Sequence, residues 1–248
     1  MSRHFLDLDG VATIPTDSLL LTRRALADVA EACAMGAVHG DAGLGKTFAV
    51  EEAVGATAES AVWTSFPGRP TMRLVATTLA EMLTGAPAPE RNRFYLTGML
   101  IDELARRRRV LIIDEAQRLN RECIEYLRHL HDHPRTTFGL LLVGGDGCWQ
   151  VLSREPMLRS RIYRRVVFRP LTTKQVLAAI PGFHPIYAGV ADEIVLLVDD
   201  YFGHGNLRNW ASFTRSAAGL CSHHRRSVID EDVARNVFAL HGGGVGAC

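Results

Sequence analysis

The chain has 248 residues, of which 47% are apolar and 22% charged, so it can bury a full hydrophobic core and is not a disordered protein. Its 28 Lys and Arg against 27 Asp and Glu leave a formal charge of +1, which excludes binding to nucleic acid through bulk charge alone. The five cysteines include no C-x-x-C pair, which argues against a disulfide framework or a zinc site. No apolar run approaches the roughly 20 residues that a membrane-spanning helix needs, so we expect a cytoplasmic protein without a membrane segment.

Strand and helix patterns alternate through the first 170 residues. In chain order they predict helix 17–35, strand 37–39, helix 46–56, strand 61–66, helices 71–83 and 93–108, strand 110–113, helix 123–131, and strands 138–143 and 166–168. The continuous apolar runs at 110–113 and 138–143 are typical of strands that are buried on both faces of a parallel sheet. The alternation therefore predicts a parallel α/β sheet with helices on both sides.

The strand signal stops after residue 171. Four helices are predicted beyond it, over residues 173–179, 191–202, 207–221 and 231–240, with Asp230 as the N-cap of the last. We therefore expect an α/β domain over residues 1–171 and a small all-helical domain over residues 172–248.

A glycine-rich motif of the form G-x-x-x-x-G-K-[ST] lies between the strand at 37–39 and the next helix. It consists of Gly40, Asp41, Ala42, Gly43, Leu44, Gly45, Lys46 and Thr47. Glycines let successive backbone N–H groups turn toward a phosphate, and the helix N-terminus adds the positive end of its dipole. We expect Lys46 to reach the β- and γ-phosphates, Thr47 to offer a hydroxyl to Mg²⁺, and Phe48 to complete the nucleotide-binding segment.

Two adjacent carboxylates, Asp114 and Glu115, follow the apolar strand at 110–113. Transfer of a phosphoryl group to water needs a metal ligand and a group that orients the attacking water, and such a pair can divide these roles. We expect Asp114 to hold Mg²⁺, directly or through water, and Glu115 to polarise the water. The alternative is an acidic helix-capping pair, and the glycine-rich motif favours hydrolysis of a nucleoside triphosphate over it.

These motifs resemble those of the AAA+ ATPases, and more narrowly those of the transposition-associated ATPases of the TniB, MuB and TnsC kind. The resemblance rests on GDAGLGKT, LIIDEAQRL with the following LRHLHD, LLLVGG, MLRSRI followed by PL, and GNLR, and it spans residues 36 to about 210. It implies a P-loop NTPase fold, in which a three-layer αβα domain with a parallel sheet is followed by a helical lid. It also implies ATP and Mg²⁺ as ligands.

The resemblance implies further site residues. The position that senses the γ-phosphate, at the end of the fourth core strand, falls at Gly145 and Asp146. The family usually has Asn, Gln, Ser or Thr there, so this chain departs from the pattern and leaves Asp146 as the candidate. Arg159 and Arg161 match the arginine-finger region, which acts on the nucleotide of a neighbouring subunit, although both also fit a solvated basic face. Arg208 matches the sensor-2 position at the start of a lid helix.

Two arginine-rich stretches are candidates for contact with DNA. The run Arg106–Arg109 ends a predicted helix, where the helix dipole alone favours basic residues, and six arginines lie between residues 154 and 169. In the DNA-loading ATPases that the chain resembles, such stretches track phosphates inside a ring. No base-reading motif is present, so we expect sequence-independent contact with the backbone of double-stranded DNA.

The resemblance implies that ATP-bound subunits form a homo-oligomeric ring or filament on DNA, with nucleotide between neighbours, and that hydrolysis disassembles it. The implied role is a transposition helper that selects or delivers target DNA and contacts a transposase or integrase. Two alternatives stay open, because one fold serves many functions: a secretion-associated AAA ATPase, and a nucleotide-dependent protein-interaction switch without DNA binding. The substitution Glu115→Gln separates a switch from a cycling ATPase, since only the latter loses turnover.

Overall fold

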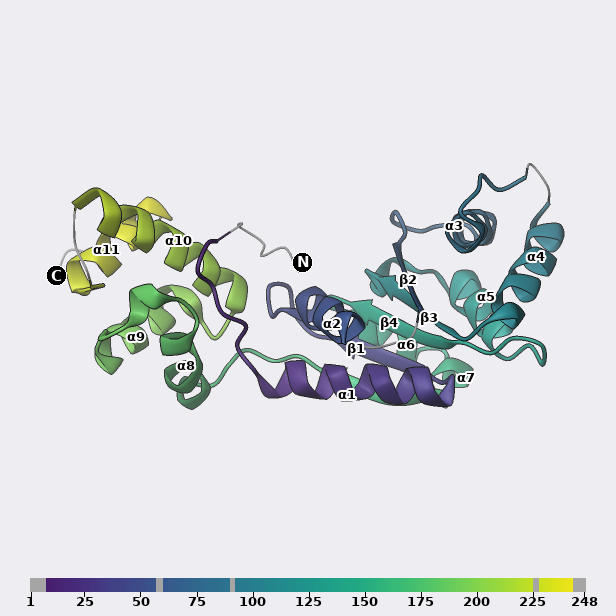
Figure 1. Ribbon diagram of the computed structural model, residues 1–248, viewed down its shortest axis with the longest axis horizontal. Coiled ribbons are helices and arrows are strands. Elements are labelled where there is room, and N and C mark those ends of the chain that lie inside the picture. The colour runs from purple at the N-terminus through teal and green to yellow at the C-terminus, as the bar shows by residue number, and fades with distance from the viewer. Residues whose placement is uncertain (1–7, 57–59, 90–91, 225–227, 243–248) are drawn as a thin grey trace. The chain divides into compact units, whose positions relative to one another are not determined.

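The computed structural model describes residues 8–56, 60–89, 92–224 and 228–242 (Figure 1). The chain divides into two compact units. The first, which we call the sheet unit, comprises Ser18–Ala42 and Lys46–Phe168. The second, the helical unit, comprises Met1–Asp17, Gly43–Gly45 and Arg169–Cys248.

The sheet unit is built on five parallel strands in the order β2-β3-β4-β1-β5. These are β1 (Met35–His39), β2 (Ser60–Ser65), β3 (Arg109–Asp114), β4 (Gly139–Gly144) and β5 (Ile162–Val167). In the register of β1 with β4, His39 pairs with Gly144, so the carboxyl ends of these central strands lie at one edge of the sheet. The predicted parallel α/β sheet is confirmed.

Helices cover both faces of this sheet. Helix α1 (Asp17–Ala32) packs on one face, where a Cβ at Gly36 would lie 2.8 Å from Val29 Cγ2. On the opposite face, α3 (Met72–Thr84), α4 (Arg93–Arg106) and α5 (Arg121–His131) enclose a core with the inward side chains of β3 and β4. Figure 1 shows α1 and α3 on opposite sides of the strands. The unit is therefore a three-layer αβα sandwich.

Capping residues fix where the helices of the α3 to α5 layer begin. The side chains of Thr71, Asn92 and Asn120 each accept a hydrogen bond from the backbone N–H three residues on, at 3.2, 3.0 and 2.9 Å. Each of these bonds satisfies a backbone donor that has no partner inside the helix. Gly85 ends α3 with a φ of +70°, a conformation that glycine adopts without steric cost.

The helical unit contains α8 (Thr173–Ala179), α9 (Asp192–Val198), α10 (Leu207–His224) and α11 (Glu231–Leu240). Its core includes the fully buried Trp210 and Phe213, and Leu8, Val11 and Ile14 pack against this core. The Asp230 side chain accepts a hydrogen bond from Val233 N at 2.9 Å, which confirms the predicted N-cap. Within the described ranges, the structure contains no helix with the length and apolar character that a bilayer crossing requires.

Several predictions of element bounds were wrong, and two elements were missed. The helix predicted over 93–108 ends at Arg106, and Arg109 begins β3 with only 3% of its surface exposed. Strand β5 begins at Ile162 instead of 166, because its residues alternate between half-buried and exposed and so form no apolar run. Two short helices between β4 and β5 were missed, α6 (Cys148–Ser153) and α7 (Pro156–Arg159), since each is too short to show periodicity.

Candidate active site

The glycine-rich segment connects β1 to α2 (Lys46–Gly55). Two of its glycines are required by geometry: Gly40 has φ +149° and Gly43 has φ +82°, and a Cβ on Gly40 would lie 2.3 Å from Phe168 O. Lys46 is 9% exposed, and its Nζ donates a hydrogen bond to the carbonyl of Asp41 at 2.6 Å. The lysine therefore lies folded over its own loop, where its ammonium group is held beside the turning backbone.

The remaining predicted loop residues differ in burial. Leu44 is 4% exposed and Phe48 is half-buried, whereas Asp41, Ala42 and Thr47 are exposed.

Thr47 and Asp114 lie together although they come from different elements. Thr47 Oγ1 donates to Asp114 Oδ2 at 3.4 Å, and Asp114 Oδ1 accepts the backbone N–H of Glu115 at 2.8 Å. Burial raises the pKa of Asp114 above its ordinary value, while the hydrogen bonds and the charge of Lys46 oppose that shift. A hydroxyl and a carboxylate are oxygen donors of the kind that Mg²⁺ prefers, so this pair fits the expected cation.

Glu115 occupies the turn at the end of β3 with φ +55° and ψ +38°, a backbone conformation that is uncommon outside glycine. Its side chain is 41% exposed and holds two contacts through Oε2. Gln117 Nε2 donates to this oxygen at 2.7 Å, and Arg118 Nη2 lies 3.2 Å from it. Sequence reasoning missed Gln117, although its place two residues after Glu115, in a turn beyond a buried strand, was a usable signal.

The end of β4 differs from the family pattern in structure as well as in sequence. Gly145 N donates to Gln117 Oε1 at 2.9 Å, which joins this strand end to the turn that carries Glu115. Asp146, the predicted candidate, is exposed and makes no polar contact with another described residue. The polar group at this strand end is therefore the Gln117 amide.

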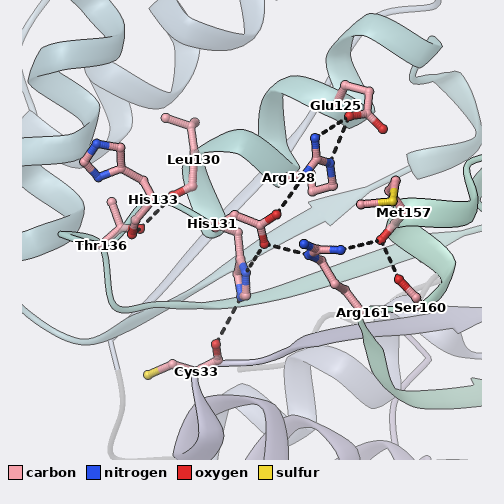
Figure 2. Close-up of polar contacts among 11 residues, drawn as sticks. Cys33, Glu125, Arg128, Leu130, His131, His133, Thr136, Met157, Ser160 and Arg161 are labelled. Atoms are coloured by element: carbon pink, nitrogen blue, oxygen red, sulfur yellow. Dashed lines mark hydrogen bonds and ion pairs between the residues drawn. The ribbon is translucent and has the colours of Figure 1, made fainter.

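Arg159 and Arg161 have different surroundings. Arg161 Nε donates to Asp132 Oδ1 at 2.8 Å, Arg161 Nη1 donates to Met157 O at 3.1 Å, and the side chain is 34% exposed. Asp132 Oδ2 accepts from Arg128 Nη1 at 2.7 Å, so the carboxylate joins the two guanidinium groups that Figure 2 shows. Arg159 is exposed at the end of α7, and its side chain makes no polar contact with any other residue that the structure describes.

Arg208 lies in the first turn of α10 and is exposed. Its backbone N–H donates to the carbonyl of Gly43 at 3.0 Å, and a Cβ on Gly43 would lie 2.4 Å from Asn206 Oδ1. Both contacts lie within the helical unit, to which Gly43–Gly45 belong. The start of α10 therefore contacts Gly43 within this unit.

A second polar cluster, which sequence reasoning missed, surrounds the end of β1. The buried His39 stacks on Trp149 with ring centroids 5.6 Å apart, and its Nε2 accepts a hydrogen bond from Arg165 Nε at 2.9 Å. Arg165 in turn lies 3.8 Å from the centroid of the Trp149 ring. Burial, with the positive charges of Arg165 and Lys46, lowers the pKa of His39 to about 4. His39 is therefore neutral at pH 7, directly before the glycine-rich segment.

Many arginines of the two basic stretches have partners within the chain. Arg106 pairs with Glu103, Arg108 Nη2 donates to Glu31 O at 2.5 Å, and the buried Arg109 donates to Glu103 O at 3.0 Å. In the second stretch, Arg164 donates to Asp28 Oδ2 at 2.6 Å. These contacts limit how many guanidinium groups are available to a partner molecule.

Comparisons with known proteins identify the family to which the chain belongs. Residues 29–152 match the family described as AAA domain (AAA_22). Over 145 residues the chain is 28% identical to the Mu-like prophage FluMu DNA transposition protein B of Haemophilus influenzae, and the match covers 58% of this chain and 49% of that protein. The match thus spans about half the length of this curated relative.

Two solved structures resemble the whole chain in fold. The ORC2 protein of Aeropyrum pernix, in ADPNP–ADP complexes, has a TM-score of 0.65 and 17% identity, covering 96% of this chain and 71% of that one. The ORC1 protein of Aeropyrum pernix, in complex with DNA, has a TM-score of 0.64 and 19% identity, covering 94% and 67%. With its glycine-rich loop, its paired carboxylates and a family match over half its length, the chain belongs to the AAA domain family of AAA+ ATPases.

Proposed function

We propose that this protein binds ATP with Mg²⁺ and hydrolyses it to ADP and phosphate. The observation that carries the proposal is the meeting of Thr47, Asp114 and Glu115 beside Lys46, at the carboxyl ends of β1 and β3. Membership of the AAA domain family supports it. The solved structure with ADPNP and ADP concerns a protein of the same fold.

Each residue has a distinct task in this proposal. Thr47 and Asp114 would hold Mg²⁺, which when bound neutralises charge on the phosphate oxygens. Lys46 would exchange its hydrogen bond with Asp41 O for one with a phosphate oxygen. Glu115 would orient the attacking water and accept its proton, because Oε1, unlike Oε2, contacts no polar group among the described residues.

Two substitutions test hydrolysis and separate it from a binding-only switch. We expect Glu115→Gln to lower kcat by more than about 100-fold while ATP binding persists, since the amide cannot accept the proton. Lys46→Ala should weaken nucleotide binding itself. The measurements are phosphate release and binding of a fluorescent ATP analogue. Wild-type turnover no higher than that of Glu115→Gln would favour the switch.

We propose Arg159 as the arginine finger and assign Arg161 to the support of the sheet unit. A finger must reach a nucleotide on another subunit, and the exposed Arg159 is not held by a described partner, whereas Arg161 is held by Asp132 and Met157 O. Its planar, permanently charged fork suits transition-state oxygens.

The two arginines can be compared directly. We expect Arg159→Ala to lower kcat by about 100-fold or more, by the precedent for arginine fingers, with melting temperature unchanged. Arg161→Ala should mainly lower the melting temperature and should have a smaller effect on kcat than Arg159→Ala. Mixing Arg159→Ala subunits with Glu115→Gln subunits should recover part of the turnover, because sites with both native groups then form between neighbours. Failure to recover activity would assign Arg159 to its own subunit.

We further propose that the protein assembles on double-stranded DNA as a ring or filament and acts as a transposition helper that contacts a transposase or integrase. The match to a DNA transposition protein B supports this role, as does the fold shared with a protein solved in complex with DNA. Residues 172–248 would form the lid of the nucleotide site, with Arg208 as its sensor.

The assembly proposal is tested by ATP turnover with and without double-stranded DNA, and by light scattering at two salt concentrations. We expect DNA to raise turnover, and ATP with DNA to give large assemblies that dissolve as salt increases. Turnover that ignores DNA, without assembly, would leave a protein-directed ATPase as the function.

A further inference from the structure

The end of β4 lacks the polar side chain that senses the γ-phosphate in the family, yet it is not without a polar group. Gln117, from the 3₁₀ turn Ala116–Arg118, places its carboxamide against this strand end. A Cβ on Gly144 would lie 2.5 Å from Gln117 Oε1, and one on Gly145 would lie 3.3 Å from Gln117 Nε2. The two glycines therefore leave space that the Gln117 side chain fills.

The oxygen and the nitrogen of the Gln117 amide each make one hydrogen bond. Its Oε1 accepts from Gly145 N at 2.9 Å, and its Nε2 donates to Glu115 Oε2 at 2.7 Å. Both distances are those of well-formed hydrogen bonds, and together they fix the amide's orientation. The result is a bridge from β4 to the carboxylate proposed to activate water.

This bridge also divides the two oxygens of Glu115. Oε2 is engaged by Gln117 and by Arg118, at 2.7 and 3.2 Å. The other oxygen, Oε1, has no polar contact within the described part of the chain. A carboxylate held by one oxygen cannot rotate freely, so its second oxygen keeps one direction.

We propose that Gln117 is a positioning residue for hydrolysis, which takes the place of the missing polar side chain at the end of β4. It holds Glu115 so that Oε1 receives the proton of the attacking water, and it relays the position of β4 to that carboxylate. Gln117 itself exchanges no proton. The proposal rests on the ATP hydrolysis proposed above.

The first test is Gln117→Ala, with Gln150→Ala as the matched control because Gln150 is exposed on α6. We expect Gln117→Ala to lower kcat by about tenfold, with the Kd of a non-hydrolysable ATP analogue within about twofold of wild type. Gln150→Ala should change none of these values.

A second test moves the polar group back to β4. Once Gln117 is alanine, the space beside Gly145 is open, and the φ of Gly145 is not in the left-handed region, so the residue accepts a side chain. We expect Gln117→Ala/Gly145→Asn to recover about threefold or more of the lost kcat. Gly145→Asn alone should lower kcat, because its Cβ crowds Gln117 Nε2.

The outcomes distinguish the two proposals. If wild type shows no turnover that Lys46→Ala removes, the proposed hydrolysis fails. If wild type is active and Gln117→Ala stays within twofold of its kcat, the positioning role is overturned. The positioning role would also be overturned if Gln117→Ala weakened analogue binding, or lowered the melting temperature, to an extent that accounts for its loss of kcat. The effect would then be structural. No recovery in the double variant would overturn the equivalence of Gln117 with a β4 side chain.

Discussion

At the scale of single residues, Asp132 carries the contacts that hold Arg161 in place. It receives Arg161 Nε on one oxygen and Arg128 Nη1 on the other, at 2.8 and 2.7 Å, and follows directly after the last residue of α5. Burial alone would raise the pKa of Asp132, but the hydrogen bonds from Arg161 and Arg128 lower it below its ordinary value. The carboxylate is therefore ionised wherever the protein is folded at neutral pH.

We predict that Asp132→Asn lowers the free energy of unfolding of the sheet unit by about 1–2 kcal/mol, because it weakens two charge-assisted hydrogen bonds. The Asp132 contribution is present at neutral pH and is lost as pH falls through its lowered pKa. Urea unfolding at pH 7 measures the loss. The control is Asp102→Asn, whose pair with Arg135 is mostly exposed, with expected changes below about 0.5 kcal/mol. Equal losses in both variants would contradict the prediction.

At the scale of elements, the end of β1 is joined to β5 and α6 by a histidine that must stay neutral. His39 accepts from Arg165 of β5 and stacks on Trp149 of α6. Protonation would remove the acceptor and place a cation against Arg165. The strand end that leads into the phosphate-binding loop therefore depends on the protonation state of one side chain.

We predict that the sheet unit loses stability as pH falls from 6.5 to 4. The pKa of His39 is about 4 in the folded protein, below the ordinary 6.5, so in this window the unfolded chain binds more protons and the free energy of unfolding falls with pH. The loss should be about 2 kcal/mol larger in wild type than in His39→Gln, in which an amide oxygen can still accept from Arg165. Denaturant titrations at pH 7 and 4.5 give the difference.

The matched control for this prediction is His129→Gln, because His129 is an exposed histidine on α5. It should follow the wild-type pH dependence. Parallel curves for wild type and His39→Gln would mean that His39 does not set the acid sensitivity.

The comparison of sequence with structure is also clearest at this scale. The glycine-rich turn between β1 and α2, and the place of Asp114 and Glu115 at the end of β3, were predictable because each is a local pattern between recognisable elements. The links of Gln117 to Gly145, and of His39 to Trp149 and Arg165, join residues that are 28 or more positions apart. Such contacts depend on the strand order of the sheet, which no local pattern encodes. The start of strand β5 was predicted too late because the strand contains Arg164 and Arg165. Their partners, Asp28 of α1 and His39 of β1, are distant in the sequence.

At the scale of the whole molecule, the DNA binding that we propose for this nearly neutral chain would depend on a few outward arginines. Arg154 is exposed, and its side chain makes no hydrogen bond or ion pair with another described residue, whereas Arg106 already pairs with Glu103. We predict that Arg154→Ala weakens binding to double-stranded DNA uniformly across sequences and reduces the slope of log affinity against log salt by about 1. Fluorescence anisotropy at several salt concentrations measures both.

The control for this prediction is Arg106→Ala, which should leave the salt slope unchanged. A slope reduced by Arg106→Ala and not by Arg154→Ala would place the DNA contact at the end of α4. Loss of affinity without any change of slope would mean that Arg154 contacts something other than a phosphate.

The burial of Lys46 has a consequence for covalent chemistry on this chain. The sequence contains only two lysines, Lys46 and Lys174, and Lys174 is exposed at the start of α8. An acylating reagent at limiting concentration should therefore modify the Lys174 side chain quickly and the Lys46 side chain slowly. Mass spectrometry of the two peptides then gives the ratio of Lys46 modification to Lys174 modification. A bound nucleotide that engages Lys46 should lower this ratio further. Because the chain has so few lysines, the reactivity of Lys46 would report whether the proposed nucleotide is bound.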